Sequence, residues 1–141
     1  MIRTDREYSE LMSQMAQNKE LLAKQRKTLA TQGLSGKEIE KALAPTISFS
    51  NQFAEELEFY RKLKKGVLPP VDSFESIGQA LVALRIAKGL TQRELAQRLN
   101  VAEAQVSRDE RNEYHGITIE RAQRVLNAMG ATVKVELKIP A

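Results

Sequence analysis

The side chains of this sequence are suited to recognition rather than to catalysis. Its carboxylates are scattered along predicted helices without a nucleophile and base beside them, so no active site is expected. The single histidine, His115, stands in a polar loop beside Tyr114 with no second type of metal ligand nearby, which favours a solvated or loop-packing role. There are no cysteines, which excludes a thiolate metal site and fits a reducing cytoplasm. We therefore expect no enzyme, no cofactor and no metal.

One polar, arginine-rich stretch, residues 91–111, has the spacing to present side chains to a partner. Thr91 followed by Glu94 is a capping box that begins a helix, and Asn100 ends it because asparagine tolerates the left-handed conformation of a tight turn. A second helix is predicted over about residues 102–111. Its outward positions are Glu103, Ala104, Ser107, Arg108 and Arg111. Two short helices joined in this way form a helix-turn-helix.

A recurring pattern of residues runs through this stretch and its flanks. It consists of Gly89, Leu90, Thr91, Gln92, Glu94, Leu95, Ala96, Leu99, Val101, Val106, Ser107, Arg108 and Glu110. From Ile77 to about Met129 the chain thereby resembles the lambda-repressor/Cro-like family, also called the xenobiotic-response-element type. Two departures matter. Ala102 replaces the usual Ser or Thr cap, which forfeits about 1 kcal/mol. Asp109 stands at a usually apolar position, so either the helix is rotated or the carboxylate finds a nearby donor.

The resemblance implies which residues contact DNA. Phosphate contacts are assigned to Gln92, Arg93, Arg111 and Asn112, since a helix N-terminus and cations favour an anion. Base readout is assigned to Glu103, Ala104, Ser107 and Arg108. Arg108 can hold guanine O6 and N7 bidentately. Glu103 either accepts from a cytosine amine or forms a salt bridge with Arg111 or Arg93 and reads nothing.

Charge supports a polyanionic partner only weakly. The net charge is +4 over 141 residues, but residues 1–71 carry 12 Lys/Arg against 9 Asp/Glu and residues 72–141 carry 10 against 9. Any DNA affinity must therefore come from where cations are placed. No apolar run approaches the roughly 20 residues that span a membrane, so a cytoplasmic protein is expected.

The N-terminal region, residues 1–68, is predicted to be helical. Thr4 with Glu7 begins a helix that continues to about Thr31. Apolar residues recur every seven positions at Tyr8, Met15, Leu22 and Leu29, with polar Asn18 and Gln25 between them. This pattern indicates either one arm of a helical hairpin or a register-setting dimer seam.

A second helical segment begins at Ser35 and runs to about Lys65, with a kink or break expected at Pro45. Its helically spaced apolar residues are Phe49, Phe53, Leu57 and Tyr60. These either pack against the first helix or form a partner-binding face.

A stiff linker at about residues 66–72, containing Pro69 and Pro70, separates this region from a second domain at residues 72–141. That domain is predicted to begin with a helix whose inward residues are Phe74, Ile77, Leu81 and Leu84. Thr118 caps its last helix. The core face of that helix is assigned to Ile119, Ala122, Val125, Leu126 and Met129.

The C-terminal segment alternates apolar and polar residues, which is the pattern of a half-buried β-strand. Its apolar positions are Val133, Val135, Leu137 and Ile139. No second strand is evident in the chain, so we expect these residues to pair antiparallel with the same strand of a second copy and hold a homodimer. The alternative is a strand that folds back on its own domain.

The sequence thus predicts a mainly α protein: an N-terminal helical hairpin, a lambda-repressor-like helix-turn-helix domain and one C-terminal strand. We expect a transcriptional regulator that binds an operator as a homodimer. The N-terminal stretches IRTDREY and ELEFYRKLKKG also resemble host-inhibition-of-growth type antitoxins, which bind a toxin and repress their own operon. The alternative is a protein-interaction module or transcription cofactor that uses the helix-turn-helix as a scaffold.

Overall fold

The computed structural model describes residues 1–141 and contains six α-helices and one short 3-10 helix, with no strand. The chain divides into two compact units, residues 1–62 and residues 63–141. None of the helices combines the length and the apolar character needed to cross a membrane.

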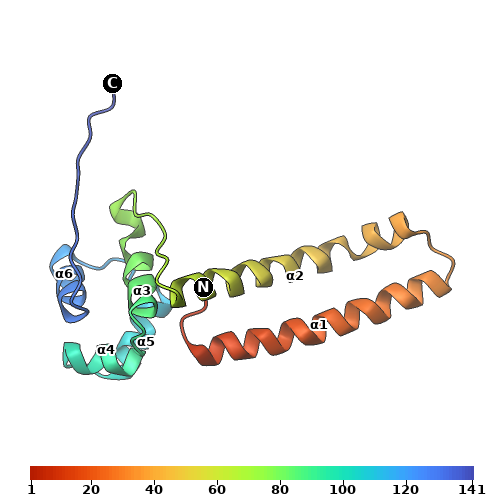
Figure 1. Ribbon diagram of the computed structural model, residues 1–141, viewed down its shortest axis with the longest axis horizontal. Helices are drawn as coiled ribbons and strands as arrows, with labels where there is room; N and C mark the ends of the chain where they lie inside the picture. Colours follow the sequence, from red (N-terminus) through yellow and green to blue (C-terminus); the bar gives the residue numbers. More distant parts are fainter. The chain divides into compact units, whose positions relative to one another are not determined.

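The first unit is an antiparallel hairpin of α1 (Asp5–Thr31) and α2 (Gly36–Lys64), seen in Figure 1 as two long ribbons joined by a short turn. Local chemistry sets its boundaries. The Thr4 hydroxyl accepts from the Glu7 amide at 3.1 Å, and the Glu38 side chain accepts from the Ser35 amide at 3.2 Å while the Ser35 hydroxyl accepts from the Glu38 amide at 3.3 Å. Both predicted helix starts are therefore confirmed.

The seven-residue pattern of α1 is used inside the hairpin. Leu22 is buried with Ile39 and Leu43 of α2, and the partly buried residues packed against them are Leu29, Leu34 and Ile47. At the open end, the Tyr8 and Tyr60 rings stack with centroids 5.3 Å apart. The prediction of a hairpin arm is confirmed, because the seam is already occupied within one chain.

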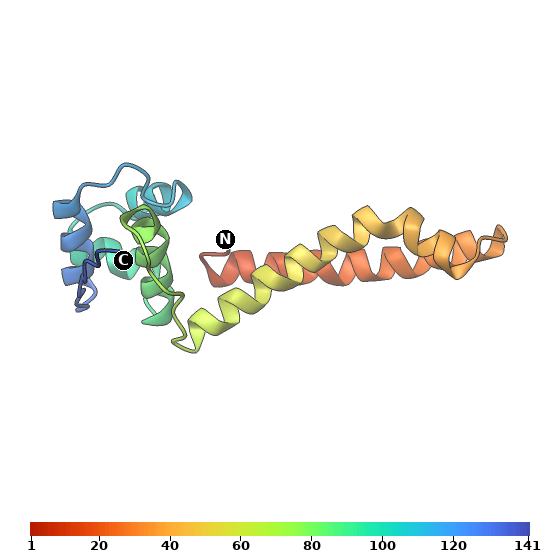
Figure 2. The same cartoon turned by 90° about the horizontal axis from the view of Figure 1, so that it is seen from above.

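Pro45 does not break α2, contrary to one of the two expectations. The helix is continuous from Gly36 to Lys64 with Pro45 inside it, and Figure 2 shows it changing direction in its first half. Proline removes one amide donor and crowds the preceding carbonyl, so a bend rather than an end is the local response.

The second unit packs its helices around one apolar core. Its elements are η1 (Phe74–Ser76), α3 (Ile77–Ala87), α4 (Gln92–Leu99), α5 (Glu103–Arg111) and α6 (Ile119–Ala128). The apolar residues of α3 to α6 and the α6 cap with at most 2% exposure are Leu81, Val82, Ala83, Ile86, Leu95, Ala96, Val106, Val125 and Met129. These residues come from α3 to α6 and the cap that follows, so each helix of the unit contributes one apolar face.

Two residues predicted to face this core do not. Phe74 is 62% exposed, because it lies in the short 3-10 turn and is out of phase with α3. Ile119 is 75% exposed, because it is the first residue of α6 and lies about one turn before Ala122, where the buried face of the helix begins.

The predicted C-terminal strand is absent, and this part of the fold prediction was wrong. Residues 131–141 form no helix or strand, and Val133, Val135, Leu137 and Ile139 are 49%, 56%, 88% and 97% exposed. A strand is held by hydrogen bonds to a neighbouring strand, and the chain provides none. Alternation of apolar and polar residues therefore does not by itself make a strand. The alternative, a strand that folds back on its own domain, is not present either.

Candidate nucleic-acid interface

Helices α4 and α5 form the turn that the sequence predicted. The Thr91 hydroxyl accepts from the Glu94 amide at 3.0 Å, and the Glu94 carboxylate accepts from the Thr91 amide at 2.8 Å. These hydrogen bonds hold the pKa of the Glu94 carboxyl below its usual value, with the bond from the Thr91 backbone the largest cause. Asn100 adopts φ 56°, in the left-handed region, and ends α4. The turn is therefore fixed by its own residues.

Helix α5 buries one face and presents the other. Val106 is 1% exposed, Ser107 is partly exposed, and the remaining assigned positions are exposed: Glu103, Ala104, Arg108, Arg111 and Asn112. Glu103 forms no ion pair with Arg111 or Arg93, so the expected alternative of a salt bridge is not present. The carboxylate is free to accept a hydrogen bond from a partner.

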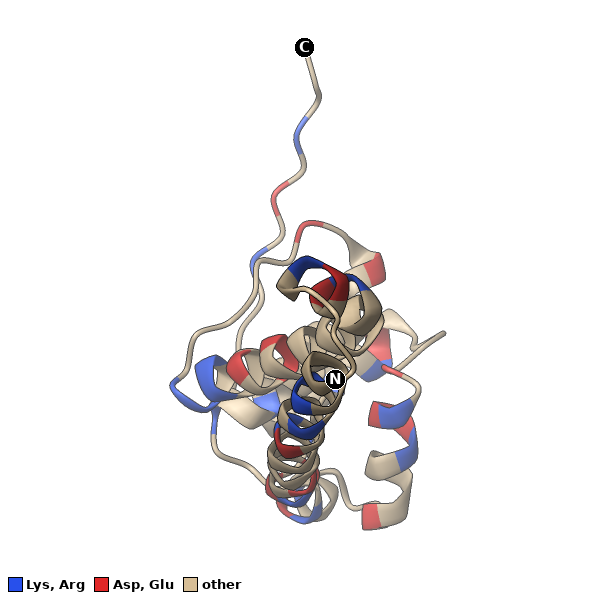
Figure 3. Cartoon of the chain, turned by 90° about the vertical axis from the view of Figure 1, so that its right-hand side faces the viewer, with Lys and Arg blue, Asp and Glu red and all other residues tan.

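Three guanidinium groups near this face have no carboxylate partner. Arg93 follows the first residue of α4, while Arg108 and Arg111 lie in the last turn of α5. All three are exposed and none forms an ion pair. Elsewhere positive and negative residues are interspersed along the ribbon, as Figure 3 shows. These three exposed guanidinium groups are therefore available to an anion, although the second half of the chain is close to neutral overall.

A buried ion pair that the sequence did not reveal lies behind this surface. Arg85 of α3 pairs with Glu110 of α5, and their side chains are 3% and 0% exposed. Arg85 Nε contacts Glu110 Oε1, Arg85 Nη2 lies 2.8 Å from Glu110 Oε2, and Arg85 Nη1 donates to the Leu90 carbonyl at 2.7 Å. The sign of this pair in the sequence is a single arginine, Arg85, in the otherwise apolar stretch Leu81–Ile86.

The same network holds Gln92. Its Nε2 donates to Glu110 Oε2 at 2.8 Å, so the first residue of α4 is tied to the centre of the domain. An amide nitrogen carries two hydrogens, and this bond uses one. The second remains available to a ligand at the N-terminus of α4. Arg85 and Glu110 are therefore positioning residues for Gln92.

Asp109 is satisfied by a local donor, as expected for a carboxylate at an apolar position. Arg121 Nη2 of α6 contacts Asp109 Oδ2, and the two side chains are 38% and 24% exposed. Helix α5 is therefore anchored to α3 through Glu110 and to α6 through Asp109. Burial, with smaller effects of the Glu110 and Asp109 carboxylates, raises the pKa of the nearby Tyr114 well above its usual value.

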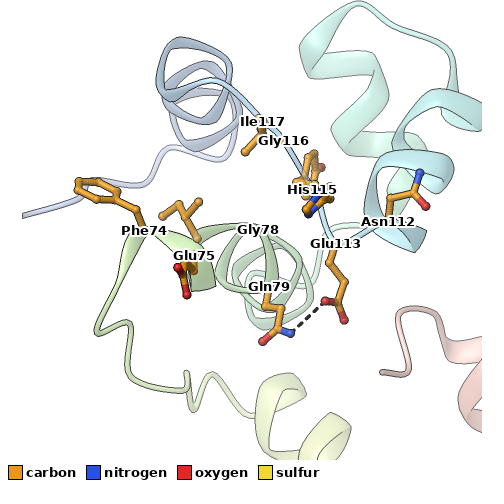
Figure 4. A pocket seen from close by; sticks show the side chains of 11 residues that line it. Phe74, Glu75, Gly78, Gln79, Asn112, Glu113, His115, Gly116 and Ile117 are labelled. Carbon is orange, nitrogen blue, oxygen red and sulfur yellow. Dashed lines mark hydrogen bonds between the residues drawn. The ribbon is translucent and has the colours of Figure 1, made fainter.

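A hollow of about 480 Å³ lies between the start of α3 and the loop that follows α5, with the lining residues shown in Figure 4. Gln79 Nε2 donates to Glu113 Oε2 across it at 3.0 Å. Gly78 approaches the loop so closely that an added Cβ would lie 1.9 Å from the Glu113 carbonyl oxygen. His115 lines the hollow, and the chain contains no cluster of three His, Cys, Asp or Glu side chains that could hold a metal ion.

Comparison with known proteins agrees with this geometry. Residues 75–138 match the family model described as a helix-turn-helix domain. This domain contains α3 to α6 and every residue assigned to DNA. The finer lambda-repressor/Cro type is not distinguished by this match. No curated protein and no solved structure matches the chain.

Proposed function

We propose that this protein is a sequence-specific DNA-binding transcriptional regulator that binds its operator as a homodimer. The observation that carries the proposal is the outward face of α5, on which Arg108 and Arg111 are exposed and free of carboxylate partners. An α-helix fits the major groove of B-DNA, and unpaired guanidinium groups are suited to bases and phosphates.

In this proposal the contacts divide by role. Arg108 reads guanine through O6 and N7, and Glu103 accepts from a cytosine amine because no cation neutralises it. Ala104 and Ser107 complete the base-facing surface. Gln92, with Arg93, Arg111 and Asn112, holds phosphates, which fixes the register without reading sequence. Two copies would place two recognition helices on successive half-sites.

The experiment is a selection of preferred DNA sites followed by affinity measurements with substituted proteins. Arg108→Ala should weaken binding at the preferred site by about 1–3 kcal/mol and relax the preference at one base pair. Gln92→Ala should weaken binding to all sequences alike. Arg6→Ala, on an exposed residue of the hairpin paired with Glu10, removes the same charge as Arg108→Ala and should leave affinity unchanged. Equal affinity of all four proteins, wild type included, would contradict the assignment.

The narrower form of the proposal is an antitoxin-like autorepressor, supported by the N-terminal resemblance alone. The neighbouring gene tests it: a toxin gene in the same operon, with an operator in its promoter, is the expected arrangement. A promoter that the purified protein does not bind would contradict autorepression.

The alternative is a protein-interaction module built on the same scaffold, and the near-neutral charge of residues 72–141 favours it. Salt dependence separates the two. Phosphate binding makes log affinity fall with log salt at a slope of about −0.9 for each phosphate neutralised. If Arg93 neutralises one phosphate, Arg93→Ala should make that slope shallower by about 0.9.

A further inference from the structure

A small hollow lies in the second unit, where the turn between α4 and α5 meets α6. It has a volume of about 150 Å³, which is roughly the liquid volume of five water molecules. Pockets for drug-sized ligands hold about 300–1,000 Å³, so the occupant of this hollow is a smaller molecule. Leu99, Val101 and Val125 form its apolar wall. The hollow therefore fits the apolar part of a compact ligand.

Three polar side chains line the same hollow and have no partner within the chain. Arg124 of α6 is exposed and forms no ion pair. Gln105 of α5 is half-buried, and its side-chain amide forms no hydrogen bond. Tyr114 is only 5% exposed, yet its hydroxyl has no hydrogen-bond partner, although a buried tyrosine usually finds one. A ligand that accepts hydrogen bonds would supply what these donors lack.

The charges around the hollow favour a single anionic group. Arg121 and Arg124 supply two guanidinium groups, and Asp109 supplies the only carboxylate of the lining. Arg121 Nη2 contacts Asp109 Oδ2, and a guanidinium carries five donors, so further N–H groups of Arg121 remain for a ligand. Burial raises the pKa of the Tyr114 hydroxyl, which therefore stays protonated and able to donate. One positive charge in excess and several donors suit one carboxylate, which guanidinium groups hold through charge-assisted hydrogen bonds.

We propose that this hollow binds a small monocarboxylate with a compact apolar group. The carboxylate accepts hydrogen bonds from Arg124, from the remaining N–H groups of Arg121 and from the Tyr114 hydroxyl. The apolar group of the ligand lies against the apolar wall. Because the wall and the donors come from the turn, from the loop after α5 and from α6, the bound molecule joins these elements and stabilises the folded domain.

The site is separate from the surface proposed for DNA. Gln105 and Asp109, which line the hollow, are one turn apart on α5 and lie on a different side of the helix from Ala104 and Arg111. The carboxylate therefore leaves the outward face of α5 open, and its binding is measured without DNA. The inference does not depend on the proposed function, and either one can fail alone.

Nuclear magnetic resonance of the full-length protein tests the site. The nitrogen-15-labelled chain is titrated with sodium isovalerate, a branched monocarboxylate, and separately with isovaleramide, the neutral molecule of the same shape, at constant ionic strength. Isovalerate should produce saturable shifts of the backbone amides around the hollow, such as those of Val101, Gln105 and Val125, and should raise the melting temperature. Isovaleramide should do neither. The absence of a saturable change with isovalerate, or equal binding of the amide, would overturn the proposal.

Substituted proteins locate the binding. Arg124→Gln should raise the isovalerate dissociation constant at least about tenfold, because it removes a cation that holds the carboxylate. Tyr114→Phe removes only the hydroxyl and should raise the constant about two- to tenfold. Lys88→Gln is the matched control, since Lys88 is an exposed, unpaired cation of the same unit outside the hollow. It should bind isovalerate as wild type does. Unchanged binding by Arg124→Gln, or equal weakening by Lys88→Gln, would show only a general attraction of anions to this unit and would overturn the inference.

Discussion

Removing one member of the buried Arg85–Glu110 pair should strongly destabilise the helix-turn-helix domain. Glu110→Ala deletes the carboxylate that accepts two contacts from the Arg85 guanidinium and one from Gln92. Arg85 would keep its bond to the Leu90 carbonyl but remain at 3% exposure without a counter-charge. Breaking a buried pair from one side costs about 3–5 kcal/mol. That is a large share of the roughly 5–15 kcal/mol that stabilises a domain.

Urea unfolding followed by circular dichroism measures this loss as a fall in the unfolding midpoint. The double substitution Arg85→Met with Glu110→Leu removes both charges and should recover most of the stability, because two apolar side chains of similar size need no partner. Glu10→Ala is the matched control for losing a paired carboxylate, since Arg6 and Glu10 are 88% and 58% exposed. It should cost no more than about 0.5 kcal/mol.

The reasoning would be refuted if Glu110→Ala cost no more than Glu10→Ala, or if the double variant were less stable than Glu110→Ala. A stable double variant that binds its operator weakly would instead separate the two roles of the network. In that case burial holds the fold, and the phosphate contact proposed for Gln92 depends on its hydrogen bond to Glu110.

Gly78→Ala should lower the melting temperature sharply, because the new Cβ would lie 1.9 Å from the Glu113 backbone oxygen in the loop after α5. Gly36→Ala is the control: a Cβ there meets no atom within 4 Å, so this substitution should be neutral or slightly stabilising. Asp109→Leu should lower the melting temperature, since the carboxylate is paired with Arg121, and a stabilised leucine variant would contradict this account of α5. The pKa of Tyr114 is raised in the folded protein above its usual value of 10.0. Above pH 10.0 the unfolded state releases the tyrosine proton while the folded state keeps it. The contribution of Tyr114 to stability is therefore present below pH 10.0 and is lost as the pH rises above it. Urea midpoints measured on both sides of this pH should therefore fall more for the wild type than for Tyr114→Phe.

Local chemistry in the sequence determined the helices and their ends. The capping residues Thr4, Ser35, Thr91 and Thr118 each begin a helix in the structure. Asn100 supplies the left-handed residue that the turn needs. Such signals act within three or four residues, so they can be read without knowing the fold. The outward positions of α5 followed from the same short-range periodicity.

Contacts between distant residues were decided only by the tertiary structure. The Arg85–Glu110 pair joins positions 25 apart in the chain, and nothing in the spacing showed that Gln92 would join it. Whether Phe74 or Ile119 is buried depended on where the core ends. The C-terminal alternation failed as a predictor for a related reason: side-chain pattern is a property of one segment, whereas a strand exists only when a second strand accepts and donates its hydrogen bonds.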